Sequence, residues 1–376
     1  MKKLIFKKFI LDTLTFFITS IIIIGVIVWT LQAINYFDFV TTDGHSLKVY
    51  FSYTILNFPK IIHRILPFVF FISLFYQINR YELKNELIIY WAAGVSKLQF
   101  IKVILGFSLF FMLVQIIMGS YISPMGQDKA RNFIRNSNID FFPSLFQEGK
   151  FIDVVQNLTI YIESEKPSGT YNNIYLKEVN KDSVNSSRVI YAKKGYLNDS
   201  KEKRYLTLFD GDVVNLNDSK TNNFSFEKIN FDLSEYTSKS ITFPKIQELN
   251  SKLLIKCLAY NAKGKAKDLK SEIFKCGKST IKNVKEEVFK RFYKPVYLLL
   301  LSMIACLLFF ISKENKRFTL YKYIIFFIGI VAIILSELSL RYATNNIVGF
   351  YFFIIFPLFS ILSLYIFSFI KSKINF

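Results

Sequence analysis

Residues 13–37 read TLTFFITSIIIIGVIVWTLQAINYF, and they contain no charged side chain. A helix rises about 1.5 Å per residue, so a run of this length covers the hydrocarbon core of a bilayer, which is about 30 Å thick. Three more charge-free runs follow at residues 103–127, 295–312 and 342–370. These four runs predict four membrane-spanning helices. We expect the first to remain uncleaved, because no small-residue cleavage site follows it.

Two further apolar stretches carry a few charges. Residues 49–78 are interrupted by Lys60, His63 and Arg64, and residues 323–340 include Glu337. Every backbone amide in a bilayer must be satisfied within the chain, so such a stretch is best interpreted as a helix with its charges at a protein interior or an interface. The sequence therefore predicts six spans. Its 52% of hydrophobic residues and mean hydropathy of +0.31 are typical of an integral membrane protein.

A polar middle segment, residues 124–291, separates the hydrophobic blocks. Apolar and polar residues alternate there in short runs, which is typical of strands, and no helical period separates the runs. The runs lie at residues 157–163, 171–178, 188–192, 205–209 and 224–231. The predicted fold is membrane α-helical with an inserted all-β domain, jellyroll-like or a sandwich. Its predicted parts are a first transmembrane half (1–123), the inserted domain with a basic C-terminal linker (124–291) and a second transmembrane half (292–376).

Lysine and arginine near the span ends predict the orientation. One side receives basic residues from both termini and from two connections, whereas the short loops of the other side hold only Lys48 and Arg341. The positive-inside rule therefore predicts cytoplasmic N- and C-termini and a large domain outside. The cytoplasmic set is Lys2, Lys3, Lys7, Lys8, Arg80, Lys84, Lys97, Lys102, Lys313, Lys316, Arg317, Lys322, Lys371 and Lys373.

The formal net charge of +20 has a second source besides these anchors. In residues 252–294, basic residues outnumber acidic ones 13 to 4. Two interpretations stay open for this segment: a solvated helical linker, or contact with anionic lipid headgroups. Nucleic-acid binding is disfavoured, because no aromatic and basic binding module is present.

No catalytic or metal-binding pattern is visible. The histidines are His45 and His63, without paired metal-ligand spacing, and the three cysteines form no CxxC pair. The spacing of Cys257 and Cys276 leaves a disulfide between them open. Residues 277–280 (GKST) resemble the end of a phosphate-binding loop, but the glycine required five residues earlier is replaced by Glu272. We expect neither enzymatic activity nor a cofactor in this chain.

The cytoplasmic connection between spans two and three, residues 80–96, predicts a short amphipathic helix. Gly94 is well placed to end it as a C-cap. Apolar and acidic residues both recur at helical spacing: Leu83, Leu87 and Tyr90, and Glu82 and Glu86. The helix could rest on lipid or bind a groove of another protein. Acidic residues are poor partners for an anionic leaflet, which favours the protein groove.

The segment NELIIYWAAGVS (85–96) is similar to the coupling helix of the LptF/LptG permeases of the lipopolysaccharide-export ABC transporter, and the resemblance runs essentially end to end. The strand string GKFID, LTIYIES, NNIYLKE, RVIYAKKGYL and LTLFDGDVV resembles the β-domain of that family. The first-span ending IVWTLQAINYFDFV and the following DGH (43–45) resemble the LptF type. The residues of this chain that match the pattern of the family are Glu86, Gly94, Pro67, Pro124, Glu287, Arg291 and Pro295.

This resemblance implies a mechanism and a set of partners. The chain would pair with a paralogous permease of the LptG type, and the first and fifth spans would line a cavity. A cytoplasmic ABC ATPase dimer would bind the ATP and contact the coupling helix (80–94). Lipopolysaccharide would leave the outer leaflet of the inner membrane and pass to periplasmic bridge proteins of the LptC/LptA type. The implied ATPase-coupling residues are Glu86, Glu82, Leu87, Tyr90 and Gly94.

A phosphorylated headgroup needs basic residues near the outer end of the spans. The candidates are Lys48, Lys60, Arg64 and Arg341. Lys48, Lys60 and Arg64 lie in or just before the outer half of span two, where charged side chains are costly, and this favours a functional role. The alternative is that these side chains extend to the headgroup layer and only anchor the helix. Glu337 and Arg341 are also spaced to pair with each other. The family places basic residues at the end of span one, where this chain has Gln32 and Asn35.

Two other classes of membrane protein remain possible from the sequence. One is a mechanotransmitting ABC subunit that does not itself move lipid, and the other is an assembly scaffold. Mechanotransmitting subunits usually place the large domain after span one, whereas here it follows span three.

Overall fold

The computed structural model describes residues 2–41, 46–136, 148–155, 158–167, 169–179, 187–199, 204–217, 220–233, 244–262 and 276–374. Within these residues, six helical segments are long and apolar enough to cross a membrane. They are Lys2–Asn35, Leu47–Leu83, Lys97–Ile134, Thr280–Phe310, Phe318–Ala343 and Ile347–Lys373. The prediction of three spans on each side of a polar segment is confirmed. His45 and the DGH segment (43–45) lie outside the described residues.

The chain forms two compact units. The helical unit contains Met1–Ile34, Tyr53–Asn132 and Phe243–Phe376, and the sheet unit contains Asn35–Ser52 and Phe133–Thr242. The short helix α2 (Asp38–Thr41) lies in the sheet unit, and α3 (Leu47–Leu56) begins there before α4. The domain boundaries at residues 124 and 291 stay a prediction.

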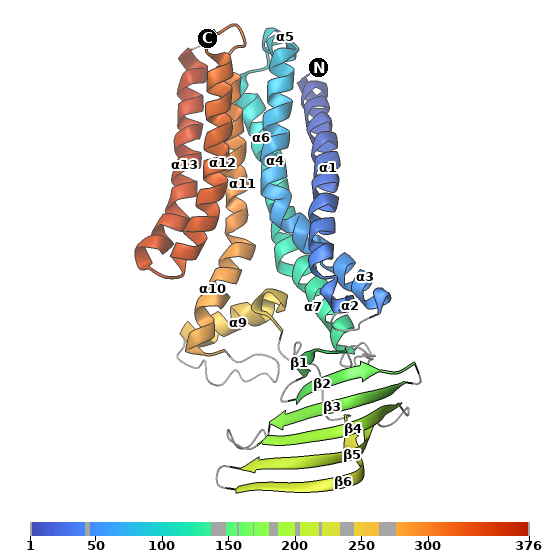
Figure 1. Cartoon of the computed structure of the whole chain (residues 1–376). Coiled ribbons are helices and arrows are strands. Elements are labelled where there is room, and N and C mark those ends of the chain that lie inside the picture. The colour runs from blue at the N-terminus through green and yellow to red at the C-terminus, as the bar shows by residue number, and fades with distance from the viewer. Residues whose placement is uncertain are drawn as a thin grey trace. The chain divides into compact units, whose positions relative to one another are not determined.

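In the helical unit, α1, α4 and α6 lie side by side, as do α11, α12 and α13 (Figure 1). The first half consists of α1 (Lys2–Asn35), α4 (Phe58–Leu83), α5 (Glu86–Ala92), α6 (Lys97–Ile117), a π-helical turn (Met118–Ile122) and α7 (Ser123–Asn136). The second half consists of α9 (Ser251–Ala262), α10 (Lys278–Phe292), α11 (Tyr297–Cys306), α12 (Phe318–Ala343) and α13 (Ile347–Ile374). Short 3₁₀ turns lie at Ile246–Glu248, Lys294–Val296 and Leu307–Phe310.

Helix α11 is the centre of the helical unit. Every residue of this helix except Leu299 is buried, and the helix packs against α4, α6, α12 and α13. Its sequence YLLLLSMIAC has no charged face to offer to water, as expected for a helix enclosed by others. Helix α12 approaches α4 closely, because a side chain at Gly329 would meet the ring of Phe71 at 2.0 Å. Glycine is therefore required at this crossing.

Helix α1 is attached differently, through one narrow stripe. Its buried residues recur every fourth position along most of the helix: Phe9, Thr13, Phe17, Ile21 and Gly25. The stripe packs on α4 and α6, with the Phe17 ring 6.2 Å from Phe70 and 4.7 Å from Phe111. Many of its other apolar side chains, among them Ile22 and Ile23, are exposed. Such a helix is suited to a lipid environment with one protein contact.

The sheet unit holds six antiparallel strands in sequential order, each paired with its neighbour in the chain. They are β1 (Phe151–Val155), β2 (Leu158–Glu165), β3 (Thr170–Val179), β4 (Ser187–Asp199), β5 (Arg204–Asn217) and β6 (Lys220–Asp232). The predicted all-β domain is confirmed, and all five predicted runs lie in β2 to β6 apart from Asn157, which is outside the described residues. Among the described strands the connection is that of a meander, without a crossover.

One face of the sheet carries its core. Alternate residues of β2, Leu158, Ile160 and Ile162, are buried, and they pack with Leu176 and Ile190 of the next two strands. Because side chains alternate across a strand, the residues between them belong to the opposite face. The register places Ile160 beside Leu176, and Leu176 beside Ile190. The alternation that predicted the strands therefore also defines which face is apolar.

Candidate functional site

The segment predicted as one helix over residues 80–94 is divided: α4 continues to Leu83, and a turn at Lys84 and Asn85 separates it from α5. Asn85 adopts the left-handed conformation with φ of 62°, which asparagine tolerates better than most residues. The other end of α5 is closed by Gly94, with φ of 76°, and the Val95 amide donates to the Tyr90 carbonyl at 3.1 Å. This is the glycine C-cap that the sequence predicts. In Figure 1, α5 lies at the same end of the helical unit as both chain termini.

The inner side of α5 packs on a cluster of aromatic rings. Leu87 is fully buried and Tyr90 is nearly so. The centre of the cluster is Phe100 of α6, which is also fully buried. Its ring contacts those of Phe6, Phe9, Tyr90, Trp91 and Phe309, at centroid distances of 5.4, 4.9, 6.2, 5.8 and 5.3 Å. One ring thus joins α5 to α1, to α6 and to the end of the fourth span.

Glu82 and Glu86, the two acidic residues of the predicted coupling helix, also accept hydrogen bonds from other parts of the chain. Glu86 accepts hydrogen bonds from the Lys8 ammonium at 3.1 Å and from the Tyr90 hydroxyl at 3.3 Å. Burial raises the pKa of that hydroxyl. Glu82 is buried and accepts from the backbone amide of Lys313 at 2.9 Å. Glu86 therefore connects α5 to α1, and Glu82 connects α4 to the loop that follows the fourth span.

The outward side of α5 is apolar as well. Ile88 and Ile89 are 43% and 61% exposed, and Leu83 at the end of α4 is 52% exposed. Helical spacing selected Leu87 and Tyr90, which the structure places against the helical unit, whereas Ile88 and Ile89 were missed. The available signal was the run LIIYW, which is apolar all round a single short helix. Such a run indicates that both sides of the helix make apolar contacts.

The basic candidates lie in different places. Lys60 and Arg64 of α4 line a narrow polar cavity, to which α10 contributes Lys290. Lys60 is partly buried and Arg64 is exposed. Lys48 is exposed on α3, in the sheet unit, and Arg341 is exposed in the last turn of α12. The structure therefore brings two of the four candidates to one cavity.

His63 forms a wall of the same cavity. Its ring presses on Gly119 in the π-helical turn, where a side chain would approach the ring to 2.6 Å. Single π-turns inside α-helices are frequent at functional sites. Glu337, for which Arg341 was the expected partner, forms an ion pair with Lys294 instead. Lys294 belongs to the fourth span and is 43 residues from Glu337, so a search for partners at helical spacing could not identify it.

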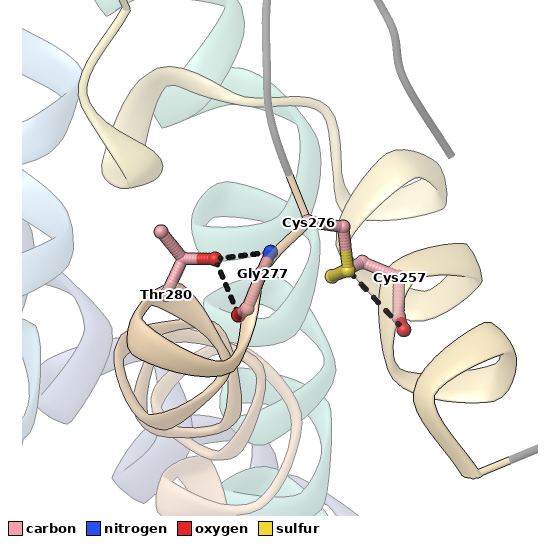
Figure 2. Close-up of a disulfide and its surroundings, with 4 residues drawn as sticks. All are labelled: Cys257, Cys276, Gly277 and Thr280. Atoms are coloured by element: carbon pink, nitrogen blue, oxygen red, sulfur yellow. Dashed lines mark hydrogen bonds between the residues drawn. A yellow bond between two sulfur atoms is a disulfide. The ribbon is translucent and has the colours of Figure 1, made fainter. Parts of the chain in front are cut away.

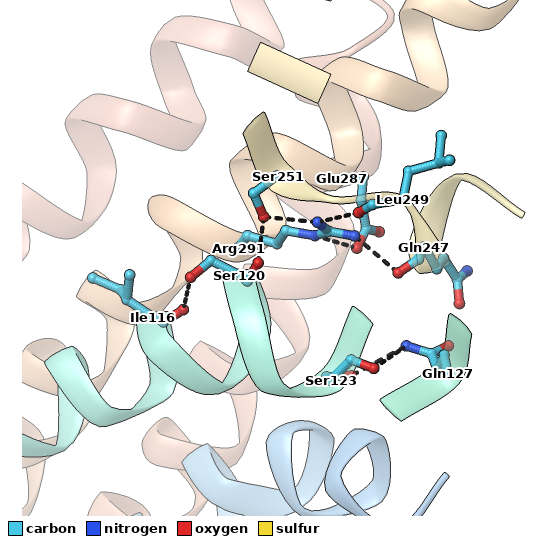
Figure 3. Close-up of polar contacts among 9 residues, drawn as sticks. All are labelled: Ile116, Ser120, Ser123, Gln127, Gln247, Leu249, Ser251, Glu287 and Arg291. Carbon is cyan, nitrogen blue, oxygen red and sulfur yellow. Dashed lines mark hydrogen bonds and ion pairs between the residues drawn. The ribbon is translucent and has the colours of Figure 1, made fainter. Parts of the chain in front are cut away.

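A buried guanidinium organises the segment that leads into α9 (Figure 3). Arg291 is only 1% exposed and binds Glu287, one turn earlier in α10, at 2.9 Å. It also donates to the Leu249 carbonyl at 2.9 Å, the Ser251 hydroxyl at 2.8 Å and the Gln247 carbonyl at 2.9 Å. Ser251 donates in turn to the Ser120 carbonyl in the π-helical turn. The planar guanidinium therefore holds three chain segments together.

A disulfide joins Cys257 of α9 to Cys276, just before α10 (Figure 2). The bridge that the spacing left open is present, and both cysteines are buried in a small apolar cluster with Leu254 and Val284. The GKST segment forms the start of α10, where the Thr280 hydroxyl accepts from the Gly277 amide at 3.0 Å. The basic segment 252–294 is thus helical on both sides of residues 263–275, which lie outside the described residues.

No cluster of three or more histidine, cysteine, aspartate or glutamate side chains in the described part of the chain could hold a metal ion. Six apolar helices, split three and three around an inserted sheet, define a multi-pass membrane protein with one large polar domain. A family model described as Lipopolysaccharide export system permease LptF/LptG matches residues 5–371. The chain therefore belongs to this family of permease subunits, which are not themselves catalytic. Both findings fit a multi-pass protein of the inner membrane.

One curated relative is also similar. It is the protein named Uncharacterized protein RP871 of Rickettsia prowazekii (strain Madrid E), which is 27% identical over 195 residues. The match covers 51% of this chain and 52% of the relative, so the chain spans about half the length of the curated relative that it matches.

Proposed function

We propose that this chain extracts lipopolysaccharide from the outer leaflet of the inner membrane and passes it to a periplasmic bridge. Family membership supports lipopolysaccharide export. The observation that carries the finer proposal is the construction of α5, which is fixed to the helical unit on one side and presents Ile88 and Ile89 on the other. An apolar, exposed helix that is packed on the helical unit on its other side is suited to receive force from a second protein.

The orientation follows from charge. The end of the helical unit that carries α5 also carries Lys7 and Lys8 of α1 and Lys371 and Lys373 of α13. By the positive-inside rule this end is cytoplasmic, and the sheet unit is periplasmic. A cytoplasmic ATPase dimer therefore meets α5, binds the ATP and supplies the hydrolysis. A paralogous permease completes the transporter, and bridge proteins receive the lipid on the periplasmic side.

The contacts of α5 give a route for movement into the spans. A tilt of α5 is transmitted to α6 through Phe100 and to α1 through the pair of Glu86 and Lys8. Because α1 is attached by a single stripe, it can shift along α4 with fewer contacts to break than the enclosed helix α11. We assign α1 and α12, the first and fifth spans, to the wall of the lipid cavity.

At the opposite end of α4, Lys60 and Arg64 are the proposed headgroup contacts. Their support is a narrow cavity in which both side chains and Lys290 are combined with one carboxylate, Glu287, at the end of an apolar span. That carboxylate balances only one of the three basic side chains, and each charge in such a position is costly to maintain without a polar partner. Phosphate groups of a lipid supply that partner through charge-assisted hydrogen bonds.

The coupling proposal is tested with Glu86→Ala in the complete transporter, reconstituted in nanodiscs with its partner permease and ATPase. We expect normal membrane insertion but weaker ATPase co-purification, or hydrolysis that no longer drives lipid release. Lys8→Ala is the matched control, because it removes the same intrachain pair and leaves the carboxylate in place. If both variants lose coupling equally, Glu86 acts on α1 and not on the ATPase. Unchanged yield and transport in Glu86→Ala would contradict its role.

The headgroup proposal is tested by photocrosslinking of lipopolysaccharide to this subunit. The double variant Lys60→Ala with Arg64→Ala is expected to crosslink less, while Arg317→Ala, an exposed basic residue before α12, leaves crosslinking unchanged. Full crosslinking in the double variant would show that the two residues only anchor α4. A subunit that couples to the ATPase but never crosslinks lipid would be a mechanotransmitter.

A further inference from the structure

The face of the sheet opposite its core carries a row of aromatic rings. Cross-strand pairing places Phe151, Tyr161, Tyr175 and Tyr191 side by side on β1 to β4. The ring centroids of Phe151 and Tyr161 lie 4.6 Å apart, and those of Tyr175 and Tyr191 lie 5.2 Å apart. Phe151 is 67% exposed and Tyr191 is 51% exposed. Cross-strand aromatic pairs stabilise a sheet, but they do not require this degree of exposure.

Polar residues interrupt the sheet beside this row. The strand pairing skips Asn173, Lys193 and Asp210, which lie on three neighbouring strands. Asn173 and Asp210 have positive φ angles of 46° and 49°, a conformation that costs energy for residues other than glycine. The three residues therefore mark a line along which the sheet departs from regular pairing, next to the aromatic rings.

The rings and the polar residues line one hollow of about 670 Å³. This volume is within the range of about 300–1,000 Å³ that is usual for small-molecule sites with aromatic walls and a few polar groups. Asp212, which is paired with Tyr191 across the strands, adds a second carboxylate to the wall and accepts from Ser225 at 2.6 Å. The hollow thus combines four aromatic faces with two carboxylates, an amide and an ammonium group.

This combination selects a class of ligand. An acyl chain has no groups that can form hydrogen bonds with carboxylates or an ammonium group. A peptide strand adds to an open sheet edge, whereas the rings of Tyr161, Tyr175 and Tyr191 lie on interior strands. Sugar rings offer C–H faces that pack on aromatic rings, and hydroxyl groups that donate to carboxylates and accept from amide or ammonium donors.

We propose that this aromatic hollow of the sheet unit is a saccharide-binding site, in which the rings of Phe151, Tyr161, Tyr175 and Tyr191 stack on sugar faces and Asp210, Asp212, Asn173 and Lys193 bind hydroxyl groups. The site concerns the sheet unit alone and goes beyond the proposed coupling and headgroup functions. Two sources share this chemistry: the saccharide part of a transported lipid, and a glycan of the cell wall.

Binding is measured on the full chain in nanodiscs by saturation-transfer NMR, with two soluble probes used separately. One is a delipidated lipopolysaccharide core oligosaccharide, and the other is the peptidoglycan disaccharide of N-acetylglucosamine and N-acetylmuramic acid. We expect saturable binding of at least one probe. Tyr191→Ala is expected to weaken it about tenfold through the loss of one stacking partner, whereas Tyr191→Phe keeps the affinity. The probe that binds identifies the source.

The matched control is Tyr196→Ala. Tyr196 lies on the same strand as Tyr191 and stacks on Phe209 at 5.8 Å, but it does not line the hollow. Asp210→Asn removes one carboxylate and keeps a residue that tolerates positive φ, so it tests the site even if Tyr191→Ala unfolds the sheet. Absence of saturable binding of both probes, or equal loss in Tyr191→Ala and Tyr196→Ala, would overturn the proposal.

Discussion

The two ends of the helical unit are held together by different kinds of contact. At the α5 end, the contacts are mainly aromatic rings around Phe100, with one ion pair whose lysine is 58% exposed. At the α9 and α10 end, a buried guanidinium and a disulfide fix the chain. Ring contacts tolerate small shifts, because both edge-to-face and offset-stacked arrangements are favourable and each contact contributes only about 0.5–1.5 kcal/mol beyond burial. The hydrogen bonds that Arg291 donates depend on direction, and a displacement of the guanidinium breaks them together.

From this difference we expect the α5 end to shift more easily than the α9 and α10 end. The α5 end can tilt gradually while its rings stay in contact. The opposite end keeps the segment that returns from the sheet unit in one position relative to α10 and the π-helical turn. We therefore expect substitutions at the α9 and α10 end to lower stability more than substitutions at the α5 end, and the α5 substitutions to affect coupling more than stability.

The largest effect is expected for Arg291→Met. It removes the ion-pair partner of the largely buried Glu287 and the donors of two carbonyls, so the free energy of unfolding should fall by about 3–5 kcal/mol. Thermal unfolding in detergent measures the change. Arg341→Met is the matched control, because that arginine is exposed on α12. Equal melting temperatures for the two variants would show that the guanidinium does not hold this end.

An intermediate effect is expected from removal of the disulfide. Cys257 and Cys276 are 19 residues apart, and a crosslink of this loop size stabilises a fold by about 3 kcal/mol. The double variant Cys257→Ser with Cys276→Ser should melt at a lower temperature and should not respond to reductant, whereas the unmodified chain should respond. Cys306→Ala serves as the control, because this buried thiol is free. A reductant response that persists in the double variant would contradict the assignment.

The smallest effect on stability is expected for Phe100→Leu. Leucine fills most of the space but removes the ring contacts, which should cost about 1–2 kcal/mol. Hydrogen exchange of the α5 amides should increase, and coupling to the ATPase should weaken. Phe110→Leu, at a position 58% exposed on the same helix, should change neither. If Phe100→Leu destabilises as strongly as Arg291→Met, the proposed difference between the two ends is wrong.

The spans and strands could be predicted from the sequence because both depend on local patterns. Charge-free runs have the length that a bilayer requires, and alternation such as LTIYIES fixes a half-buried strand whatever lies elsewhere. Gly94 was predictable for the same reason, since a C-cap requires only the helix that precedes it.

The contacts that define the candidate site could not be predicted, because they join residues far apart in the chain. Glu86 and Lys8 are 78 residues apart, and Glu82 and the Lys313 amide are 231 apart. Helical spacing grouped Leu83, Leu87 and Tyr90, but Leu83 lies in α4 and is exposed, and the spacing could not show that Leu87 and Tyr90 face the helical unit. Which side is exposed depends on the packing of Phe100, which no local pattern contains.

The Arg291 contacts also constrain the order of biosynthesis. The carbonyls of Gln247 and Leu249 are synthesised more than 40 residues before the guanidinium that binds them. During translation this turn has no donor from Arg291, and it reaches its final form only after Arg291, in the first part of the fourth span, has been made. Formation of these contacts therefore requires that the chain has been made through Arg291, and a chain truncated before Arg291 should be exposed to proteolysis at this turn.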